Sequence, residues 1–268
     1  MTASIVDTLR VLRINRDASQ YIEDSIVRES PLTIIFNGEE LVTLLCSPQH
    51  LDYLAIGYLV SEGLLKQKGD IKRLLTDDQR GVVRVDTAGG SQGEAAELTF
   101  KRLITSGCGR GSPVYSIGEV PISRITSSVS IAPSQVLTLM KNFQQRCTTF
   151  KTTGGVHAAA LCNNNEILVF HEDIGRHNAI DKVLGQCFLE DITTAERLLL
   201  TSGRVSSEVV FKTARRGISI LISKSAPTDL GVKLAQDLGI TLVGFVRGQR
   251  MNVYANEWRT NTNERPRD

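Results

Sequence analysis

The sequence predicts a protein of the α/β class, α+β overall, with a small β-rich N-terminal domain that holds one helix and a three-layer C-terminal α/β domain. Two patterns predict this class. In the second half, short and nearly continuous apolar runs alternate with runs of helical period, which is typical of a sheet covered by helices on both faces. In the first half, two β-rich runs flank Asn37-Gly38, the strongest short signal for a β-hairpin turn.

The chain begins with an arm, a hairpin and a helix. Residues 1–20 show no strong pattern and predict a flexible, loosely held arm. The run PLTIIFNGEELVTLLC predicts the hairpin. Residues 48–65 place apolar side chains at helical spacing, and Gly63 suits the end of that helix.

A second β-rich region completes the N-terminal domain. The runs RGVVRVDTA and ELTFKRLIT predict strands, and a Gly- and Ser-rich stretch between them predicts a loop. Residues 105–131 then lack a regular pattern. We therefore expect an N-terminal domain over residues 21–131 and a C-terminal domain over residues 132–268.

For the C-terminal domain, the sequence pattern predicts the element order α-β-β-α-β-α-β-α-β. A helix over residues 135–147 precedes the strands VHAAALC and EILVFH, and residues 177–189 form the next helix. The strands RLLLTS, ISILIS and ITLVGFV then alternate with the helices SSEVVFKTARRG and DLGVKLAQDLG. The polar tail from Trp258 is expected to fray.

Composition narrows the class of partner and the compartment. The chain has 268 residues, of which 41% are hydrophobic and 22% charged, with a net charge of +2. This balance indicates neither nucleic acid nor a membrane surface as a partner. No run approaches the ~20 apolar residues of a membrane helix, and the first residues do not resemble a secretory signal. We expect a cytoplasmic protein whose five cysteines are free thiols.

Cations recur where the three late strands end. Ligands of open α/β sheets bind beyond the carboxyl ends of the parallel strands, and helix N-termini there attract anions. The cations at these ends are Arg204, Lys224, Arg247 and Arg250. If they converge on one rim, the ligand is anionic, with phosphate or pyrophosphate as the expected group. The alternative is that they are ordinary solvated charges.

Histidines gather near the same expected edge. His171 and His177 lie six residues apart around a Gly turn, and His157 follows two glycines. This spacing does not match the zinc-protease pattern, so no metal site is predicted. We expect the three imidazoles to bind backbone and phosphate at the rim. A purely structural pair of His177 with Asp181, four residues on, is the alternative.

Cys108 is the candidate nucleophile. It lies in the run TSGCGRGS, where three glycines leave the thiol unshielded, and Arg110 favours the thiolate. Cys46, Cys162 and Cys187 lie in apolar patterns and predict buried thiols, whereas the pattern around Cys147 is ambiguous. An incidental surface cysteine is the alternative for Cys108.

The predicted order of the C-terminal elements is similar to the cytidine-deaminase fold. Those enzymes carry H-x-E or C-x-E at one helix start and P-C-x-x-C at the next, which hold a catalytic zinc. The matching places here read RHNA and GRVSS, without cysteine and without a correctly spaced Glu. The scaffold is therefore expected to be deaminase-like, but zinc-dependent deamination is not supported.

Several segments together resemble the formate dehydrogenase accessory sulfurtransferase family, the FdhD/NarQ family. The matching runs, in the family's order, are PLTIIFNGEELVTLLCSP, GYLVSEG, TSGCG, TGGVHAAAL, HEDIGRHNAIDKVLG, TSGR with SSE, SAPT and GFVRGQRMNVY, over roughly residues 28–255. TGGVHAAAL followed by EDIGRHNAIDK is the most specific of them.

The resemblance implies a sulfur-carrier function. Its members accept sulfur from a cysteine desulfurase as a cysteine persulfide and sulfurate the molybdenum bis(molybdopterin guanine dinucleotide) cofactor of formate dehydrogenase. The persulfide cysteine of the family loop, usually C-x-x-C, matches Cys108, but Gly111 replaces the second cysteine. A carrier needs one thiol, so the relay stays possible. The family forms homodimers.

The family's cofactor-binding stretch matches one run of this chain. It comprises Phe245, Val246, Arg247, Gly248, Gln249 and Arg250. Arg204 and Lys224 are expected to complete a phosphate clamp, with His157 and His177 on phosphate or near the sulfur. Two other functions stay open. A nucleotide-directed hydrolase would need a metal, and a non-catalytic chaperone would bind cofactor or apo-enzyme without using Cys108.

Overall fold

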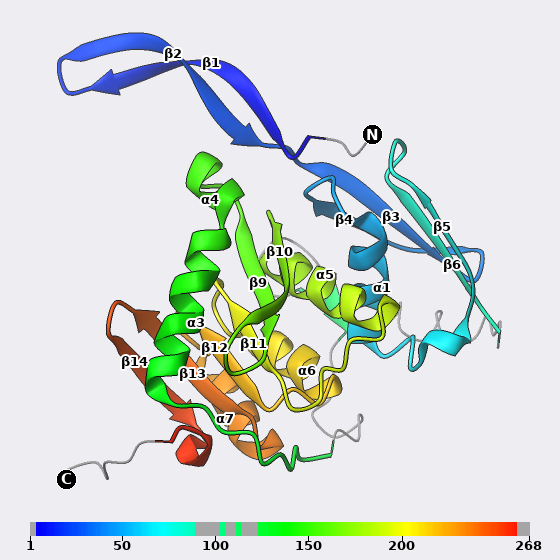
Figure 1. Ribbon diagram of the computed structural model, residues 1–268. Helices are drawn as coiled ribbons and strands as arrows, with labels where there is room; N and C mark the ends of the chain where they lie inside the picture. Colours follow the sequence, from blue (N-terminus) through cyan, green and yellow to red (C-terminus); the bar gives the residue numbers. More distant parts are fainter. Residues whose placement is uncertain (1–3, 89–101, 105–110, 114–122, 262–268) are drawn as a thin grey trace.

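The computed structural model describes residues 4–88, 102–104, 111–113 and 123–261. It confirms the mixed α/β class: a six-stranded sheet and a four-stranded sheet are joined by helices, and two further strand pairs accompany them. Figure 1 shows the four-stranded sheet beside one long helix, and the six-stranded sheet surrounded by the others. Among the described residues, no helix has both the length and the apolar character needed to cross a membrane.

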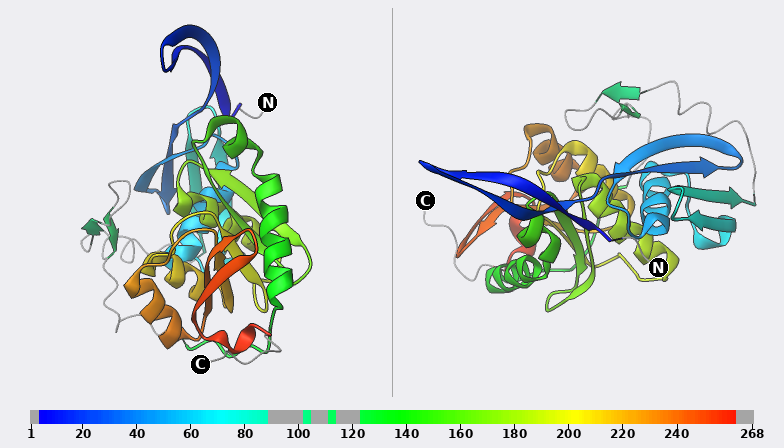
Figure 2. Two further views of the ribbon diagram at one scale, coloured as in Figure 1. Left: turned by 90° about the vertical axis from the view of Figure 1, so that its left-hand side faces the viewer. Right: turned by 90° about the horizontal axis from the view of Figure 1, so that it is seen from above.

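The predicted flexible arm is a β-hairpin. Strands β1 (Val6–Asn15) and β2 (Ala18–Val27) pair antiparallel through ten residue pairs, so the paired segment extends past residue 20. Figures 1 and 2 show it projecting from the body of the molecule. This hairpin was not predicted because its turn contains neither Asn-Gly nor any other glycine. Arg16 in the turn takes the left-handed conformation, with φ 48°.

The four-stranded sheet follows directly. Its strands are β3 (Ser30–Phe36), β4 (Glu39–Cys46), β5 (Ile71–Asp77) and β6 (Val82–Thr87), in the order β4-β3-β6-β5. The predicted turn is confirmed, since Asn37 and Gly38 both have positive φ, at 51° and 87°. Strand β5 was not predicted, because its apolar residues Ile71, Leu74 and Leu75 are spaced as on a helix.

Helix α1 (Leu51–Glu62) links the two halves of the molecule. Gly63 ends it in the left-handed conformation with φ 81°, as predicted. One face of α1 shares an apolar core with the four-stranded sheet, and this core reaches Phe188 on helix α5 (Arg176–Leu189). A short 3-10 turn, η1 (Lys68–Asp70), then leads into β5.

The six-stranded sheet has the order β10-β9-β11-β12-β13-β14. Strands β11, β12 and β13 are parallel to one another, whereas β9, β10 and β14 pair antiparallel. Its elements besides α5 are α3 (Pro133–Arg146), α4 (Thr148–Thr153), β9 (His157–Cys162), β10 (Ile167–Asp173), β11 (Leu198–Thr201), α6 (Ser207–Arg215), β12 (Ile220–Ser223), α7 (Asp229–Leu238), β13 (Thr241–Arg247), β14 (Arg250–Ala255) and the 3-10 turn η2 (Glu257–Arg259).

Helices cover both faces of this sheet, which confirms the predicted three layers. Leu198 and Leu200 of β11 share a buried cluster with the apolar face of α3, while Leu199 between them belongs to the cluster of α5, α6 and α7. Because successive side chains of a strand point to opposite faces of the sheet, those of β11 pack into two separate cores. Figure 2 shows the helices on either side of the strands.

One helix and one strand of this half were not predicted. Helix α4 consists of TTFKTT, a poor helix former by composition. The carboxylate of Glu172 on β10 accepts hydrogen bonds from the backbone N–H groups of Thr149 and Phe150, both at 2.9 Å, and so caps the helix from outside. Strand β14 is the other. In the N-terminal half, strand β7 (Arg102–Ile104) lies inside the predicted run ELTFKRLIT, whose other residues lie outside the described ranges, and it pairs with β8 (Gly111–Pro113), which was not predicted.

The tail is held further than predicted. Arg259 is 3% exposed, and its guanidinium donates to the carbonyls of Gly239 at 2.7 Å and of Ile125 at 3.3 Å. Ile131 donates through its backbone N–H to the carbonyl of Arg259 at 2.8 Å. The segment from Ile125 to Ile131 therefore packs on the C-terminal half. The expected fraying is wrong for residues 258–261, and the rest of the tail lies outside the described residues.

Candidate functional site

The loops after β11, β12 and β13 form one continuous surface, which we call the rim. The N–H of Lys224 donates to the carbonyl of Thr201 at 3.2 Å, and that of Phe245 donates to the carbonyl of Ser225 at 3.1 Å. The hydroxyl of Ser223 donates to the carbonyl of Gly203 at 2.7 Å. Because β11, β12 and β13 are parallel, these loops lie at the same edge of the sheet, where open α/β sheets bind ligands.

The predicted cations lie on this rim. Arg247 donates through Nε to the carbonyl of Lys224 at 3.2 Å, and Arg250 is its cross-strand partner in the β13–β14 hairpin. Arg204 is exposed in the loop after β11, next to Gly203, whose carbonyl accepts the hydrogen bond from Ser223. The exposed ends of these side chains form a surface suited to an anionic ligand.

Sequence reasoning missed Arg176, the first residue of α5. Its side chain lies against Gly203 of the neighbouring loop, since a Cβ added there would sit 2.8 Å from the Cβ of Arg176. Arg176 Nε is buried without a hydrogen-bond partner among the described residues. The hydroxyl of Ser206, at the N-terminal cap of α6, is likewise buried and has no partner within the described part of the chain. Both groups therefore have a hydrogen-bonding capacity that no described residue fills.

Phe245 stands out at the end of β13. It has φ 51°, which is a strained conformation for an aromatic residue, and the register of the β13–β14 ladder shifts around it. The guanidinium of Arg247 lies 5.4 Å from the centre of its ring. Val246 is 1% exposed in the core beneath α3, so only its backbone can contact a ligand. Gly248 and Gln249 are exposed at the hairpin tip.

His157 and His177 lie at this edge and have different partners. His157 Nδ1 is 3.2 Å from the hydroxyl of Ser202, and burial together with the charge of Arg176 lowers its pKa. His177 Nε2 is 3.4 Å from the carboxylate of Glu208 on α6. His177 therefore pairs across two helices, and the alternative of an i,i+4 pair with Asp181 is wrong.

His171 is not at the rim. Strand β10 continues to Asp173, so His171 points under α5, where it lies 2.8 Å from Gln186 Oε1 and edge-on to Tyr53 at 5.6 Å. Since Gln186 Oε1 can only accept, His171 Nε2 carries the proton. Burial lowers the pKa of His171 to about 4. The expectation that it binds phosphate with the other histidines is wrong. Within the described ranges, no group of three or more His, Cys, Asp and Glu side chains is arranged to hold a metal ion.

Acidification is expected to destabilise the protein through His171. Its pKa is 6.5 when unfolded and about 4 when folded, so the unfolded chain binds the extra proton first as the pH falls. The free energy of unfolding should drop by up to about 3 kcal/mol between pH 6.5 and 4 from this group. Denaturation of the wild type and of His171→Phe across this range should show the wild type losing more. Parallel losses in both proteins would contradict this assignment.

The acidic half of the HEDIGRHN segment is structural. Asp173 is fully buried and accepts from Lys182 Nζ at 2.7 Å, from the N–H of Ser47 at 3.1 Å and from Asn178 Nδ2 at 2.7 Å. Asn178 Nδ2 also donates to the carbonyl of Leu45 at 2.9 Å. Ser47 and Leu45 belong to the N-terminal half, so this network joins the two halves of the molecule.

A second buried pair continues the same junction. Asp181 on α5 accepts from Lys212 Nζ on α6 at 2.7 Å and from the hydroxyl of Ser61 on α1 at 2.7 Å. Lys212 and Asp181 are 3% and 2% exposed. The motif HEDIGRHNAIDK therefore contributes Arg176 and His177 to the rim. Its buried polar residues hold α1, α5 and α6 together.

The described thiols are poor nucleophiles. Cys46, Cys147, Cys162 and Cys187 are free and buried, as predicted for three of them. Burial raises the pKa of Cys147 to about 11 and those of Cys162 and Cys187 to about 12. Thiolates are the reactive form, so these residues are inert at neutral pH. Cys108 lies outside the described residues, and the predicted role of its thiol stays a prediction.

The comparisons with known proteins agree on one family. The profile of the FdhD/NarQ family matches residues 27–261. The chain is 44% identical over 245 residues to the sulfur carrier protein FdhD of Bacillus subtilis, covering 91% of this chain and 93% of the relative. It is 45% identical over 238 residues to the protein of the same name from Geobacillus kaustophilus, covering 88% and 90%.

A solved structure shares the fold. It is a proposed formate dehydrogenase accessory protein from Desulfotalea psychrophila, with a TM-score of 0.78 and 25% identity. The match covers 96% of this chain and 100% of that chain. The overall fold described above is therefore shared with a solved protein.

Proposed function

Because this chain belongs to the FdhD/NarQ family, we propose that it is a sulfur carrier that acts in the maturation of formate dehydrogenase. The observation that carries the proposal is the similarity to proteins named sulfur carrier protein FdhD over about nine-tenths of both chains. Sulfur carriage needs a thiolate, and the burial of the four described cysteines leaves Cys108 as the candidate.

The transfer has two steps. The Cys108 thiolate attacks the outer sulfur of a persulfide on a cysteine desulfurase, the donor's S–S bond breaks, and the donor cysteine leaves as a thiolate. In the second step the outer sulfur leaves Cys108 as a neutral atom, and Cys108 keeps the bonding electron pair. The recipient, the reduced metal of the molybdenum bis(molybdopterin guanine dinucleotide) cofactor, supplies the two electrons that turn this sulfur into sulfide. The chain acts by positioning these groups.

The rim is the proposed binding site for this cofactor. Its phosphates would contact Arg204, Lys224, Arg247 and Arg250. The unpartnered Nε of Arg176 and hydroxyl of Ser206 favour the same place, since a ligand oxygen would complete their hydrogen bonds. The ring of Phe245 offers a flat apolar face for a guanine base. His157, held by Ser202, then lies beside the phosphates.

Guanosine diphosphate should bind to the rim as a probe of the cofactor's nucleotide end. Replacing Arg247 with glutamine removes a charged donor and is expected to weaken binding by about tenfold. Isothermal titration calorimetry of the wild type, Arg247→Gln and the exposed control Arg84→Gln would measure this. Equal affinity of all three proteins would exclude Arg247 from the nucleotide site.

Cys108 separates the proposed carrier from a non-catalytic chaperone that only binds cofactor or apo-enzyme. Cells that lack their own copy of this protein should regain formate dehydrogenase activity with the wild-type chain and show essentially none with Cys108→Ser, because a hydroxyl forms no persulfide. Cys147→Ala is the matched control and should restore activity. Full activity with Cys108→Ser would favour the chaperone.

The proposal includes a homodimer in the cytoplasm. The projecting hairpin of β1 and β2 exposes large apolar side chains, among them Ile14 at 67% and Tyr21 at 64%. An isolated two-stranded hairpin is marginally stable in water, so a second copy that covers it would stabilise both. The other proposed partners are the cysteine desulfurase that donates sulfur and the formate dehydrogenase apo-enzyme.

A further inference from the structure

A basic cavity lies at the edge of the six-stranded sheet opposite the rim. It has a volume of about 380 Å³ and is bounded by η1, the end of α5, the loop over residues 191–195 and the end of α6. This loop precedes β11, and the end of α6 precedes β12. The parallel strands β11 and β12 therefore separate the cavity from the rim, and one ligand phosphate cannot contact both.

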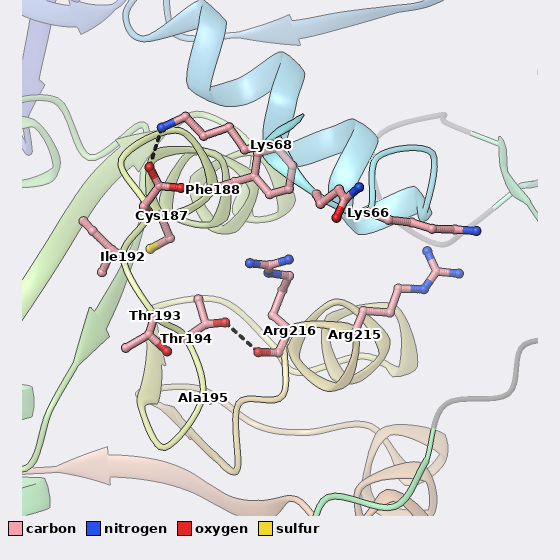
Figure 3. Close-up of a pocket in the computed structure, with 12 residues that line it drawn as sticks. Lys66, Lys68, Cys187, Phe188, Ile192, Thr193, Thr194, Ala195, Arg215 and Arg216 are labelled. Atoms are coloured by element: carbon pink, nitrogen blue, oxygen red, sulfur yellow. Dashed lines mark hydrogen bonds and ion pairs between the residues drawn. The ribbon is translucent and has the colours of Figure 1, made fainter. Parts of the chain in front are cut away.

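The charged residues that line the cavity are mostly cations. They include Lys66, Lys68, Arg215 and Arg216, against the single carboxylate of Asp191. Lys68 forms an ion pair with Asp191 at one side (Figure 3). Lys66 and Arg216 add two further positive charges to the lining. The carboxyl ends of α5 and α6 together carry roughly one negative elementary charge, which is too little to cancel them.

Arg216 occupies the centre of the cavity. Figure 3 shows its guanidinium pointing into the space between Phe188, Arg215 and the threonine loop. The guanidinium carbon lies 5.7 Å from the centre of the Phe188 ring, and the hydroxyl of Thr194 donates to the Arg216 carbonyl at 2.6 Å. The ring contact holds the side chain and the hydrogen bond holds the backbone, and neither supplies a negative charge.

The polar capacity of Arg216 is unfilled. Its Nε is buried and has no hydrogen-bond partner among the described residues, and no ion pair of this side chain occurs within them. Burial lowers the pKa of Arg216. A guanidinium that packs on an aromatic ring at a cavity, with one donor unfilled, is suited to bind a phosphate.

We propose that this cavity is a second anion site, separate from the rim, which binds a small phosphate-bearing molecule with its phosphate on Arg216. Lys66 would meet the same phosphate group from the η1 side, and the exposed Thr193 offers a hydroxyl from the loop. The site does not depend on Cys108 or on the rim, so it stands or falls independently of the sulfur-carrier function.

Inorganic pyrophosphate is the probe, and its binding is measured by calorimetry in a background that weakens the rim by removing two of its cations. In Arg204→Gln/Arg247→Gln, pyrophosphate should still bind. Adding Arg216→Gln to this background should weaken that binding by about tenfold or more, whereas adding the exposed control Arg84→Gln should leave it unchanged. Circular dichroism would check the fold, and Lys66→Gln, at an exposed position, serves if Arg216→Gln unfolds.

Two results would overturn the proposal. One is the absence of pyrophosphate binding in the rim background, and the other is unchanged affinity with Arg216→Gln or, if that variant unfolds, with Lys66→Gln. Guanosine diphosphate binding to the wild-type rim is measured separately, so a failure at the cavity leaves the rim result intact and the reverse also holds.

Discussion

Replacing Lys182 with methionine is expected to lower the free energy of unfolding by about 3–5 kcal/mol. Lys182 is fully buried, and its Nζ lies 2.7 Å from the Asp173 carboxylate and 3.2 Å from the Ser47 carbonyl. The variant keeps the apolar stem but leaves Asp173 as a buried negative charge without a countercharge. In a chain of this size the melting temperature should fall by roughly 10 °C, as calorimetry would show.

The double variant Lys182→Met/Asp173→Asn isolates the charge. It removes both ions, so it should be more stable than Lys182→Met alone. With Asp173→Asn measured as well, the complete cycle gives the coupling between the two groups. Lys233→Met, an exposed position on α7, is the matched control and should change stability by no more than about 0.5 kcal/mol. A Lys182→Met protein as stable as this control would contradict the structural role of the network.

Replacing Gly57 with alanine is expected to destabilise the protein by about 3 kcal/mol or more. Helix propensity alone predicts the opposite, a gain of about 1 kcal/mol. The close approach of α1 and α5 reverses the sign, because a Cβ on Gly57 would sit 1.7 Å from the carbonyl oxygen of Asp181. Gly185 faces α1 in the same way, at 1.9 Å from the carbonyl oxygen of Tyr53. The helices would have to move apart and loosen the Ser61–Asp181 hydrogen bond.

Urea denaturation of Gly57→Ala and of the control Gly69→Ala would test this packing. A Cβ on Gly69 meets nothing within 4 Å, so that variant should be close to neutral. Gly57→Ala should shift the midpoint to lower urea. A Gly57→Ala protein at least as stable as the wild type would mean that α1 and α5 are not in such close contact.

Much of the fold could be predicted from local pattern. The Asn37-Gly38 turn, the Gly63 helix end and the alternating elements of the second half all follow from short-range chemistry. The missed elements depend on distant partners or on unusual turns. Helix α4 relies on the Glu172 carboxylate, and the arm hairpin turns through Arg16 without any glycine. Sequence periodicity does not report such contacts.

The candidate site could be predicted only where topology fixes it. Parallel strands place their carboxyl ends at one edge, so the cations of the rim followed from element order alone. The position of His171 away from the rim could not be predicted, because β10 extends two residues further than its apolar run suggests. Arg176 was overlooked because its helix start is adjacent to the rim loops in space and distant from them in sequence. The buried roles of Asp173 and Asp181 likewise depend on the N-terminal half.

Transfer of one sulfur atom to Cys108 tests the central claim most directly. The protein is incubated with a cysteine desulfurase and cysteine, alkylated and examined by intact and peptide mass spectrometry. We predict one added sulfur on the peptide that contains Cys108, removable by a thiol reductant and absent from Cys108→Ser. An unmodified Cys108 while the desulfurase turns over, or the added sulfur on another cysteine, would contradict the sulfur-carrier account.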